Sequence, residues 1–127
     1  MKVWLAVLLL SVSATALAAE QGLGLPSCRL AEQRALPGEL GGSISDPRQA
    51  HVSMRANVLL ADVSTAHKAR QISQKQATAF SEKIAAVRQR TDALVKQQGF
   101  LSAAERASFD REFDDIAKQI CQPQPAR

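Results

Sequence analysis

Apolar side chains recur at alternating spacings of four and three along three segments of the chain. This period places them on one stripe of a helix, with polar residues around the rest. Nowhere do apolar and polar residues alternate with the period of two that marks a strand. The pattern predicts an all-α protein, a three-helix antiparallel bundle over about 47–70, 74–97 and 103–121. The stripes are Val52, Ala56, Leu59, Val63 and Ala66; Ala77, Phe80, Ile84, Val87, Leu94 and Val95; and Phe109, Phe113, Ile116 and Ile120.

Each expected helix begins at a residue that can bond the free N–H groups of a first turn. Asp46 precedes Pro47, and a proline at the first helical position sacrifices no hydrogen bond. The stretch 72–76 is repeated 29 residues later at 101–105, and each copy places a serine three residues before Gln or Glu. That spacing is typical of a capping box, in which the two residues bond reciprocally. The expected N-caps are Asp46, Ser73 and Ser102.

The junction between the first two helices allows two interpretations. The apolar stripe of the first helix continues in phase through Arg70, Ser73 and Ala77, and neither Gly nor Pro interrupts it there. One long helix folded back on a shorter one is therefore an alternative arrangement. Because two polar residues interrupt the stripe where the capping box lies, we expect a break near 71–73. At the second junction, Gly99 is expected to end the helix in the left-handed conformation.

The first 18 residues have the parts of a secretory signal. Lys2 is followed by an apolar run to about Val12, and Ala16 and Ala18 are the small residues that a signal peptidase requires. The run is too short for a membrane anchor, which needs about 20 apolar residues. We therefore expect a cleaved signal peptide over 1–18, and a periplasmic or secreted protein with no stable membrane insertion after cleavage.

The segment between the leader and the first long helix, residues 19–46, is rich in Gly and Pro and is expected to be irregular. Within it, Ser27 can cap a short helix that Pro37 then ends. The exported chain has two cysteines, Cys28 and Cys121, and an even number in an oxidising compartment predicts one disulfide. This bond would clamp the N-terminal segment along the bundle, and residues 122–127 would form a disordered tail.

The charge of the chain argues against nucleic acid as a partner. The net charge is +4, and removal of Lys2 with the leader leaves +3. This excess is too small to indicate nucleic acid, and the chain has no Tyr and its single Trp in the leader, so it lacks stacking platforms for single strands. Five basic residues of the second helix form either a solvated face or a face for an acidic partner or anionic lipid. They are Lys75, Lys83, Arg88, Arg90 and Lys96.

No pattern in the sequence indicates a metal site or a nucleophile. His51 and His67 would lie about 24 Å apart along one helix, too far to share a metal. Both are expected at the surface. The acidic run 110–115 lacks the glycine turn of a calcium loop, so its carboxylates are expected on a solvated face. No serine lies in a glycine-rich elbow. We therefore predict no metal and no cofactor.

A small exported helical enzyme, such as the secreted chorismate mutases, would need arginines pointing into the bundle around an anion. Three arginines are candidates, but only Arg70 lies on an apolar stripe; the others are Arg55 and Arg88. The sequence therefore favours a protein that is not an enzyme.

The repeated capping sequences resemble the twice-repeated Leu-Thr-x-x-Gln motif of the Spy and CpxP family. The similarity rests on Ile72-Ser73-Gln74-Lys75-Gln76 and Leu101-Ser102-Ala103-Ala104-Glu105. Serine replaces threonine in both copies, isoleucine replaces leucine in the first, and glutamate replaces glutamine in the second. A two-cysteine clamp is also not part of that family's pattern. The resemblance implies an all-helical periplasmic stress protein that acts as an ATP-independent chaperone or inhibits a sensor.

Taken together, these features predict a non-enzymatic periplasmic interaction protein, chaperone-like or an envelope-stress accessory, whose partner is another envelope protein. The alternative is an immunity protein or inhibitor of a secreted toxin or hydrolase, a task that also suits small, disulfide-clamped exported proteins. The sequence carries no signal for the oligomeric state.

Overall fold

The computed structural model describes residues 24–122, so the expected signal peptide (1–18) and all of the expected tail beyond residue 122 lie outside the described residues. The described chain contains a 3-10 turn, η1 (Pro26–Cys28), and four α-helices. The helices are α1 (Leu30–Ala35), α2 (Pro47–Lys68), α3 (Gln74–Gln98) and α4 (Ala103–Cys121). The fold class is all-α, as predicted.

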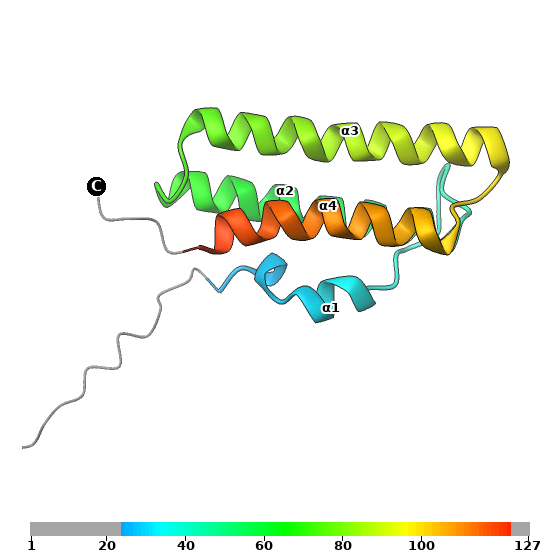
Figure 1. Cartoon of the computed structure of the whole chain (residues 1–127), viewed down its shortest axis with the longest axis horizontal. Helices are drawn as coiled ribbons and strands as arrows, with labels where there is room; N and C mark the ends of the chain where they lie inside the picture. Colours follow the sequence, from blue (N-terminus) through cyan, green and yellow to red (C-terminus); the bar gives the residue numbers. More distant parts are fainter. Residues whose placement is uncertain (1–23, 123–127) are drawn as a thin grey trace, which may run out of the picture.

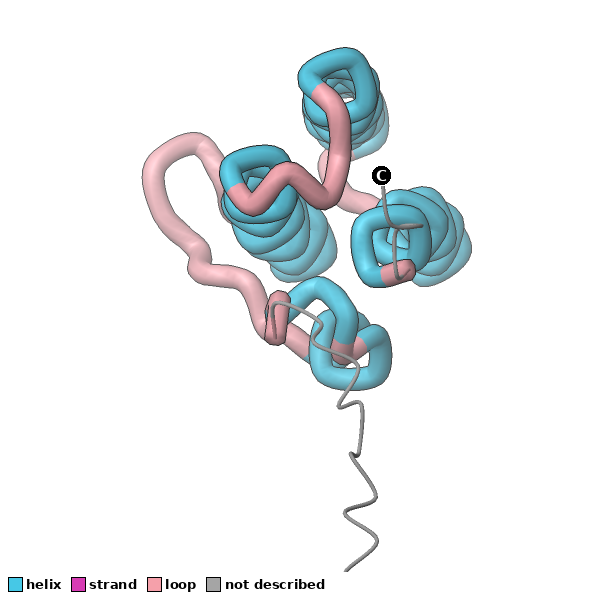
Figure 2. Tube along the Cα trace, turned by 90° about the vertical axis from the view of Figure 1, so that its left-hand side faces the viewer, coloured by secondary structure: helices cyan, strands magenta, loops and turns pink. Residues whose placement is uncertain are grey.

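The three long helices run antiparallel to their neighbours in sequence and form a bundle (Figure 1). Seen from its end, α2 and α4 lie side by side, α3 lies over one side of this pair, and η1 with α1 lies against the other side (Figure 2). α2 packs extensively against both α3 and α4, which contact each other less. We call residues 25–36 the strap, because they run along the α2–α4 face of the bundle.

The predicted apolar stripes form the core of this bundle. Val52, Ile84 and Phe113 are completely shielded from solvent, and Leu25 of the strap joins the same cluster. Fully burying a side chain of this size contributes about 1.5–3 kcal/mol. The far end of the α3 stripe is weaker, since Leu94 is only partly buried.

All three predicted N-caps have the expected geometry. Asp46 accepts a hydrogen bond from the N–H of Gln49, and both serines form the two reciprocal bonds of a capping box. The serine hydroxyls accept from the N–H of Gln76 and of Glu105 at 3.1 and 3.0 Å. These bonds satisfy N–H groups that a helix start otherwise leaves free.

α2 ends at Lys68, two residues before the predicted end, and is separate from α3, so the single long helix is wrong. The turn is a Schellman motif: Gln71 N–H donates to the Ala66 carbonyl and Arg70 N–H to the His67 carbonyl, both at 2.9 Å. Arg70 adopts a left-handed φ of 60° to make this possible.

The turn between α3 and α4 also contains a left-handed residue. Gly99 has a φ of 89°, and its N–H donates to the Val95 carbonyl at 2.7 Å. α3 accordingly ends at Gln98, one residue beyond the predicted boundary.

The expected capping role of Ser27 is wrong. Ser27 lies in η1, and α1 begins at Leu30 after Arg29 without any side-chain cap. A helix of six residues is marginal by itself, so α1 depends on anchors to the bundle. These anchors are a disulfide and a cluster of charged side chains.

Candidate functional site

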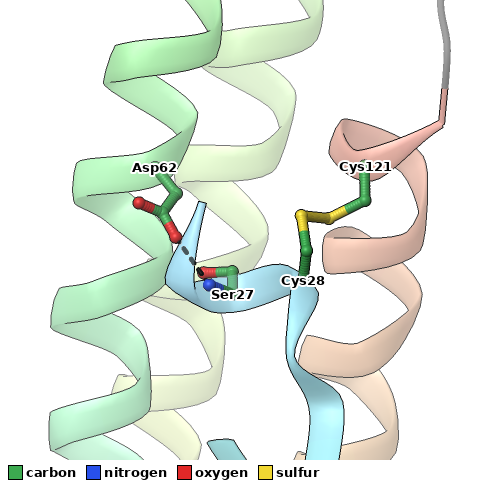
Figure 3. The surroundings of a disulfide bond; sticks show 4 residues. All are labelled: Ser27, Cys28, Asp62 and Cys121. Carbon is green, nitrogen blue, oxygen red and sulfur yellow. Dashed lines mark hydrogen bonds between the residues drawn. A yellow bond between two sulfur atoms is a disulfide. The ribbon is translucent and has the colours of Figure 1, made fainter. Parts of the chain in front are cut away.

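The first anchor of the strap is covalent. Cys28 of η1 and Cys121, the last residue of α4, form a disulfide with their Cα atoms 5.8 Å apart. Beside it, the backbone N–H of Ser27 donates to the buried carboxylate of Asp62 on α2 at 2.8 Å (Figure 3). The start of the strap is thereby fixed to both helices that it covers.

The second anchor is a cluster of charged side chains between the strap, α2 and α4, which we call the buried charge cluster. It brings together one residue of α1, two of α2 and three of α4. These are Arg34, His51, Arg55, Arg106, Asp110 and Asp114.

Arg55 is the centre of this cluster. Its side chain is only 3% exposed, and its guanidinium donates to Asp110 at 2.8 Å and to Asp114 at 3.0 Å. It also lies over the ring of Phe113, 5.5 Å from the ring centroid. The second oxygen of Asp114 accepts from Arg34 Nε at 2.8 Å, so one carboxylate links the strap to α2.

His51 occupies the end of the cluster next to the loop that leads into α2. Nδ1 lies 2.6 Å from the carbonyl oxygen of Leu36, and Nε2 lies 2.8 Å from Oδ1 of Asp110. The side chain is fully buried, so the expected surface position of His51 is wrong. The physical reason is that the strap covers this face of α2. His67, the other histidine, is partly exposed as expected.

The expectation of a solvated acidic run is wrong for two of its carboxylates. Asp110 and Asp114 are buried one position after Phe109 and Phe113, on the flank of the apolar stripe that faces α2. Burial acts to raise the pKa of Asp110, but hydrogen bonds from His51 and Arg55, together with their charges, outweigh it and hold this pKa below its usual value. Both carboxylates are therefore matched to cations, as buried charges must be.

The cluster is closed to substrates. A His–Asp pair is a frequent element of catalytic sites, but here both ring nitrogens are bonded inside the protein and the ring has no contact with solvent. Its bonds join three segments of the chain instead. The cluster therefore fixes the strap, and a binding surface has to be sought elsewhere.

The five basic residues of α3 do not lie on one face. Arg88 bonds Asn57 and approaches the Ser53 carbonyl, both on α2. Arg90 turns to the opposite flank, where it pairs with Glu112 of α4 and covers the ring of Phe109 at 5.2 Å. The other three are exposed and project in different directions around the helix; they are Lys75, Lys83 and Lys96. The predicted partner face is thus divided, and two of its members take part in helix packing.

The outer seam between α2 and α3 contains an open hollow. At the seam's end near the start of α2, polar bonds fill the space, among them Gln49 to Asp92 at 2.7 Å. Towards the α2–α3 turn several facing residues are small, and a hollow of about 400 Å³ remains, with His67, Gln74 and Glu82 also in its lining. Leu60, Val63 and Ala77 supply its apolar lining, and its hydroxyl groups come from Ser64, Thr78 and Ser81.

The sequence interpretation missed the buried charge cluster, although a signal for it exists. His51 and Arg55 lie four residues apart on one helix, and Asp110 and Asp114 lie four residues apart on another, so each pair shares a face. Two such pairs of opposite charge on helices expected to be neighbours indicate a contact. The basic partner Arg34 carries no comparable signal, because the position of the strap depends on tertiary structure.

Within residues 24–122, no group of three His, Cys, Asp or Glu side chains is arranged to hold a metal ion. The same part of the chain has no helix with the length and apolar character required to cross a membrane. No family model, curated protein or solved structure matches the chain.

Proposed function

We propose that the protein is an exported, non-enzymatic interaction protein that holds exposed apolar segments of other polypeptides, in the manner of a chaperone. The observation that supports this function best is the open hollow between α2 and α3. Its volume of about 400 Å³ falls within the range of about 300–1,000 Å³ that is typical of ligand sites. An apolar side chain of an unfolded client is the occupant that its lining suits.

The chemistry of the hollow favours many clients over one. Leu60 and Ala85 offer apolar contacts, which are not directional. The hydroxyl groups of Ser64, Thr78 and Ser81 can donate to or accept from the backbone of an extended segment, whatever its sequence. The disulfide and the strap stabilise the bundle on its other face, so the hollow is offered by a rigid scaffold.

Export is part of the proposal and rests on the leader and on the two paired cysteines. It is tested by the intact mass of the protein recovered from the periplasm or the medium. Export with cleavage predicts a chain that begins at Ala19 or one residue later. A mass that retains residues 1–18 would contradict it.

The chaperone function is tested by filling the hollow. Ser81→Leu places a larger apolar side chain at the seam, whereas Ala86→Leu adds one on the exposed surface of α3 and is the matched control. The wild type and Ala86→Leu should suppress the aggregation of several unrelated unfolded proteins, and Ser81→Leu should not, at an unchanged melting temperature. Equal suppression by all three proteins would show that clients do not bind in the hollow. No suppression by the wild type would contradict the chaperone function itself.

An inhibitor or immunity protein is the second candidate, and a different surface favours it. Phe100 is 50% exposed in the short turn between the left-handed Gly99 and the capping box of Ser102. An aromatic side chain on a fixed turn is a typical anchor of a specific interface. Photo-crosslinkers placed separately at positions 100 and 81 discriminate the two functions in cells. One stoichiometric product from position 100 indicates an inhibitor, and many products from position 81 indicate a chaperone.

A further inference from the structure

The ring of His51 lies between two oxygen atoms that can only accept hydrogen bonds. One is the carbonyl oxygen of Leu36, 2.6 Å from Nδ1, and the other is Oδ1 of Asp110, 2.8 Å from Nε2. A neutral imidazole carries a single N–H, so it leaves one of these oxygens facing a nitrogen lone pair. Only the doubly protonated ring bonds both oxygens. Hydrogen bonds to both oxygens at once therefore require the imidazolium.

The proton between His51 and Asp110 could also be carried by Asp110 as a neutral carboxylic acid, but the surroundings of Asp110 oppose this form. Its carboxylate also accepts from Arg55 at 2.8 Å, and Arg106 lies 3.8 Å from its other oxygen. These cations stabilise the ionised form. Burial acts to raise the pKa of Asp110, but hydrogen bonds from His51 and Arg55, together with the charges of these two groups, hold it below its usual value. A carboxylate paired with these cations only accepts hydrogen bonds, so the N–H between the two residues is that of His51 Nε2.

The neutral ring has a replacement partner within reach. A guanidinium nitrogen of Arg106 lies 3.3 Å from Nδ1 of His51. While Nδ1 carries its proton, it cannot accept a hydrogen bond from Arg106, and Arg106 donates to the carbonyl of Arg34 at 2.7 Å. Once Nδ1 has lost its proton, it becomes an acceptor for Arg106, and Nε2–H keeps its bond to Asp110. The carbonyl of Leu36 then loses its partner.

We infer that His51 is a proton-operated latch on the strap: the doubly protonated ring holds the carbonyl of Leu36, and loss of the Nδ1 proton exchanges that carbonyl for Arg106. The charged groups around the ring come from every element packed against it. They are Arg34 of α1, Arg55 of α2, and Arg106, Asp110 and Asp114 of α4.

Release would be confined to one end of the strap. The other end is held by the Cys28–Cys121 bond and by Asp62, neither of which depends on His51. α1 and the loop after it are held mainly by the salt bridge from Arg34 to Asp114 and by the latch itself. Raising the pH therefore loosens residues of α1 and the following loop while the disulfide stays intact. Histidine is the side chain suited to this, because its proton is ordinarily lost between about pH 5 and 8.

The latch is tested by amide hydrogen exchange on the oxidised protein, corrected for the intrinsic effect of pH on exchange. Between about pH 5.5 and about pH 8.5, protection of the amides of residues 33–36 should fall at least about tenfold, while protection in the centre of α3 stays constant. His51→Gln should remove this pH dependence, and His67→Gln, which changes the partly exposed histidine, should keep it. Constant protection in the wild type, or loss of the pH dependence in His67→Gln, would overturn the latch.

A measurement on the wild type alone decides the case if His51→Gln does not fold. The nitrogen chemical shifts of a histidine ring distinguish the imidazolium from each neutral tautomer. At about pH 5.5 the shifts of His51 should be those of the imidazolium, and at high pH those of the Nε2–H tautomer. A neutral ring at the lower pH, or the Nδ1–H tautomer at the higher pH, would overturn the inference.

The exchange of partners is tested through Arg106. Arg106→Gln removes the cation that the neutral ring would accept from, so the neutral form is less stabilised. The pH at which protection of residues 33–36 falls should therefore move upward relative to the wild type. An unchanged or lower pH of release would show that Arg106 is not the replacement partner.

Discussion

Arg70 and Gly99 occupy equivalent positions 29 residues apart, and both are left-handed, with φ of 60° and 89°. Each follows a long helix and lies three residues before the serine of a capping box. The repeat in the sequence therefore encodes the same helix–turn–helix step twice. In the second copy the left-handed residue is Gly99, and glycine adopts this conformation without strain. In the first copy it is Arg70.

We expect opposite effects from substitutions at these two positions. Arg70→Gly removes the steric cost of a left-handed side-chain-bearing residue, about 1–2 kcal/mol, which exceeds the entropy cost of glycine, about 0.5–1 kcal/mol. The free energy of unfolding should therefore rise slightly. Gly99→Ala should lower the free energy of unfolding by about 1 kcal/mol or more. This cost comes from the backbone conformation alone, because an added Cβ would meet no atom within 4 Å. Urea unfolding curves measure both, and a loss of stability in Arg70→Gly would contradict the prediction.

The capping boxes can be tested in the same way. Ser73→Ala and Ser102→Ala should each destabilise the fold by about 1 kcal/mol, since each leaves N–H groups of a first turn without a partner. Binding of any client should persist once the variants are folded, as long as the caps are only structural. Ser108→Ala, at a partly exposed position inside α4 and outside the hollow, is the control and should be neutral or slightly stabilising. A rise in the melting temperature of Ser73→Ala would mean that Ser73 lies inside a helix.

The sequence predicted the local features well because they depend on neighbouring residues. The stripes from Val52 to Ile120 follow from spacing, and the three N-caps follow from the residue types at the helix starts. The pairing of Cys28 with Cys121 follows from the count of two cysteines in a chain expected to be exported. The position of the strap does not, since α1 has no stripe of its own and is held by side chains far away in sequence. For that reason His51 and Asp114 were expected in solvent, and Ser27 was expected to cap a helix.

The buried charge cluster should be far more sensitive to substitution than an exposed pair. Arg55→Met leaves Asp110 and Asp114 buried with less positive charge, and loss of one partner from a buried pair costs about 3–5 kcal/mol. Arg90→Met removes the exposed pair with Glu112 and should cost no more than about 1 kcal/mol. Thermal or urea unfolding of the two variants compares these costs. Similar values for both would mean that the cluster contributes little to stability.

Acid should destabilise the protein through two carboxylates. The pKa of Asp110 is lowered as described, and that of Glu105 is lowered by hydrogen bonds from the backbone and side chain of Ser102 and from Gln98. Because these groups bind protons more weakly in the folded state, their contribution is complete above the pKa of the unfolded chain and is lost as the pH falls through the folded value.

The acid prediction is measured by the urea midpoint from about pH 6 down to about pH 3. Asp110→Asn should be less stable at the upper end and should lose less on acidification than the wild type. An identical slope in both proteins would show that Asp110 is not involved. This acid effect is distinct from the loosening of the strap expected at high pH, which spares the rest of the bundle.

Reduction of the disulfide should lower the melting temperature without changing the helical content at room temperature. The bond closes a loop with a sequence separation of 93 residues. In the loop-entropy model, such a bond stabilises the folded state by at most about 4–5 kcal/mol. Calorimetry of the oxidised and reduced proteins gives the difference, and Cys28→Ser/Cys121→Ser serves as the control for the reductant. Equal melting temperatures would show that the bond adds no stability.

The disulfide also decides how the molecule responds to mechanical force. Cys28 lies near the beginning of the described chain and Cys121 at the end of the last helix, at the same end of the bundle (Figures 1 and 3). Tension applied between the two ends of the chain passes through the covalent bond and does not reach the helices between them. An oxidised molecule tethered by one end and pulled by the other should extend only by its segments outside the bond. In the reduced molecule the same pull would separate the strap and α4 from the bundle.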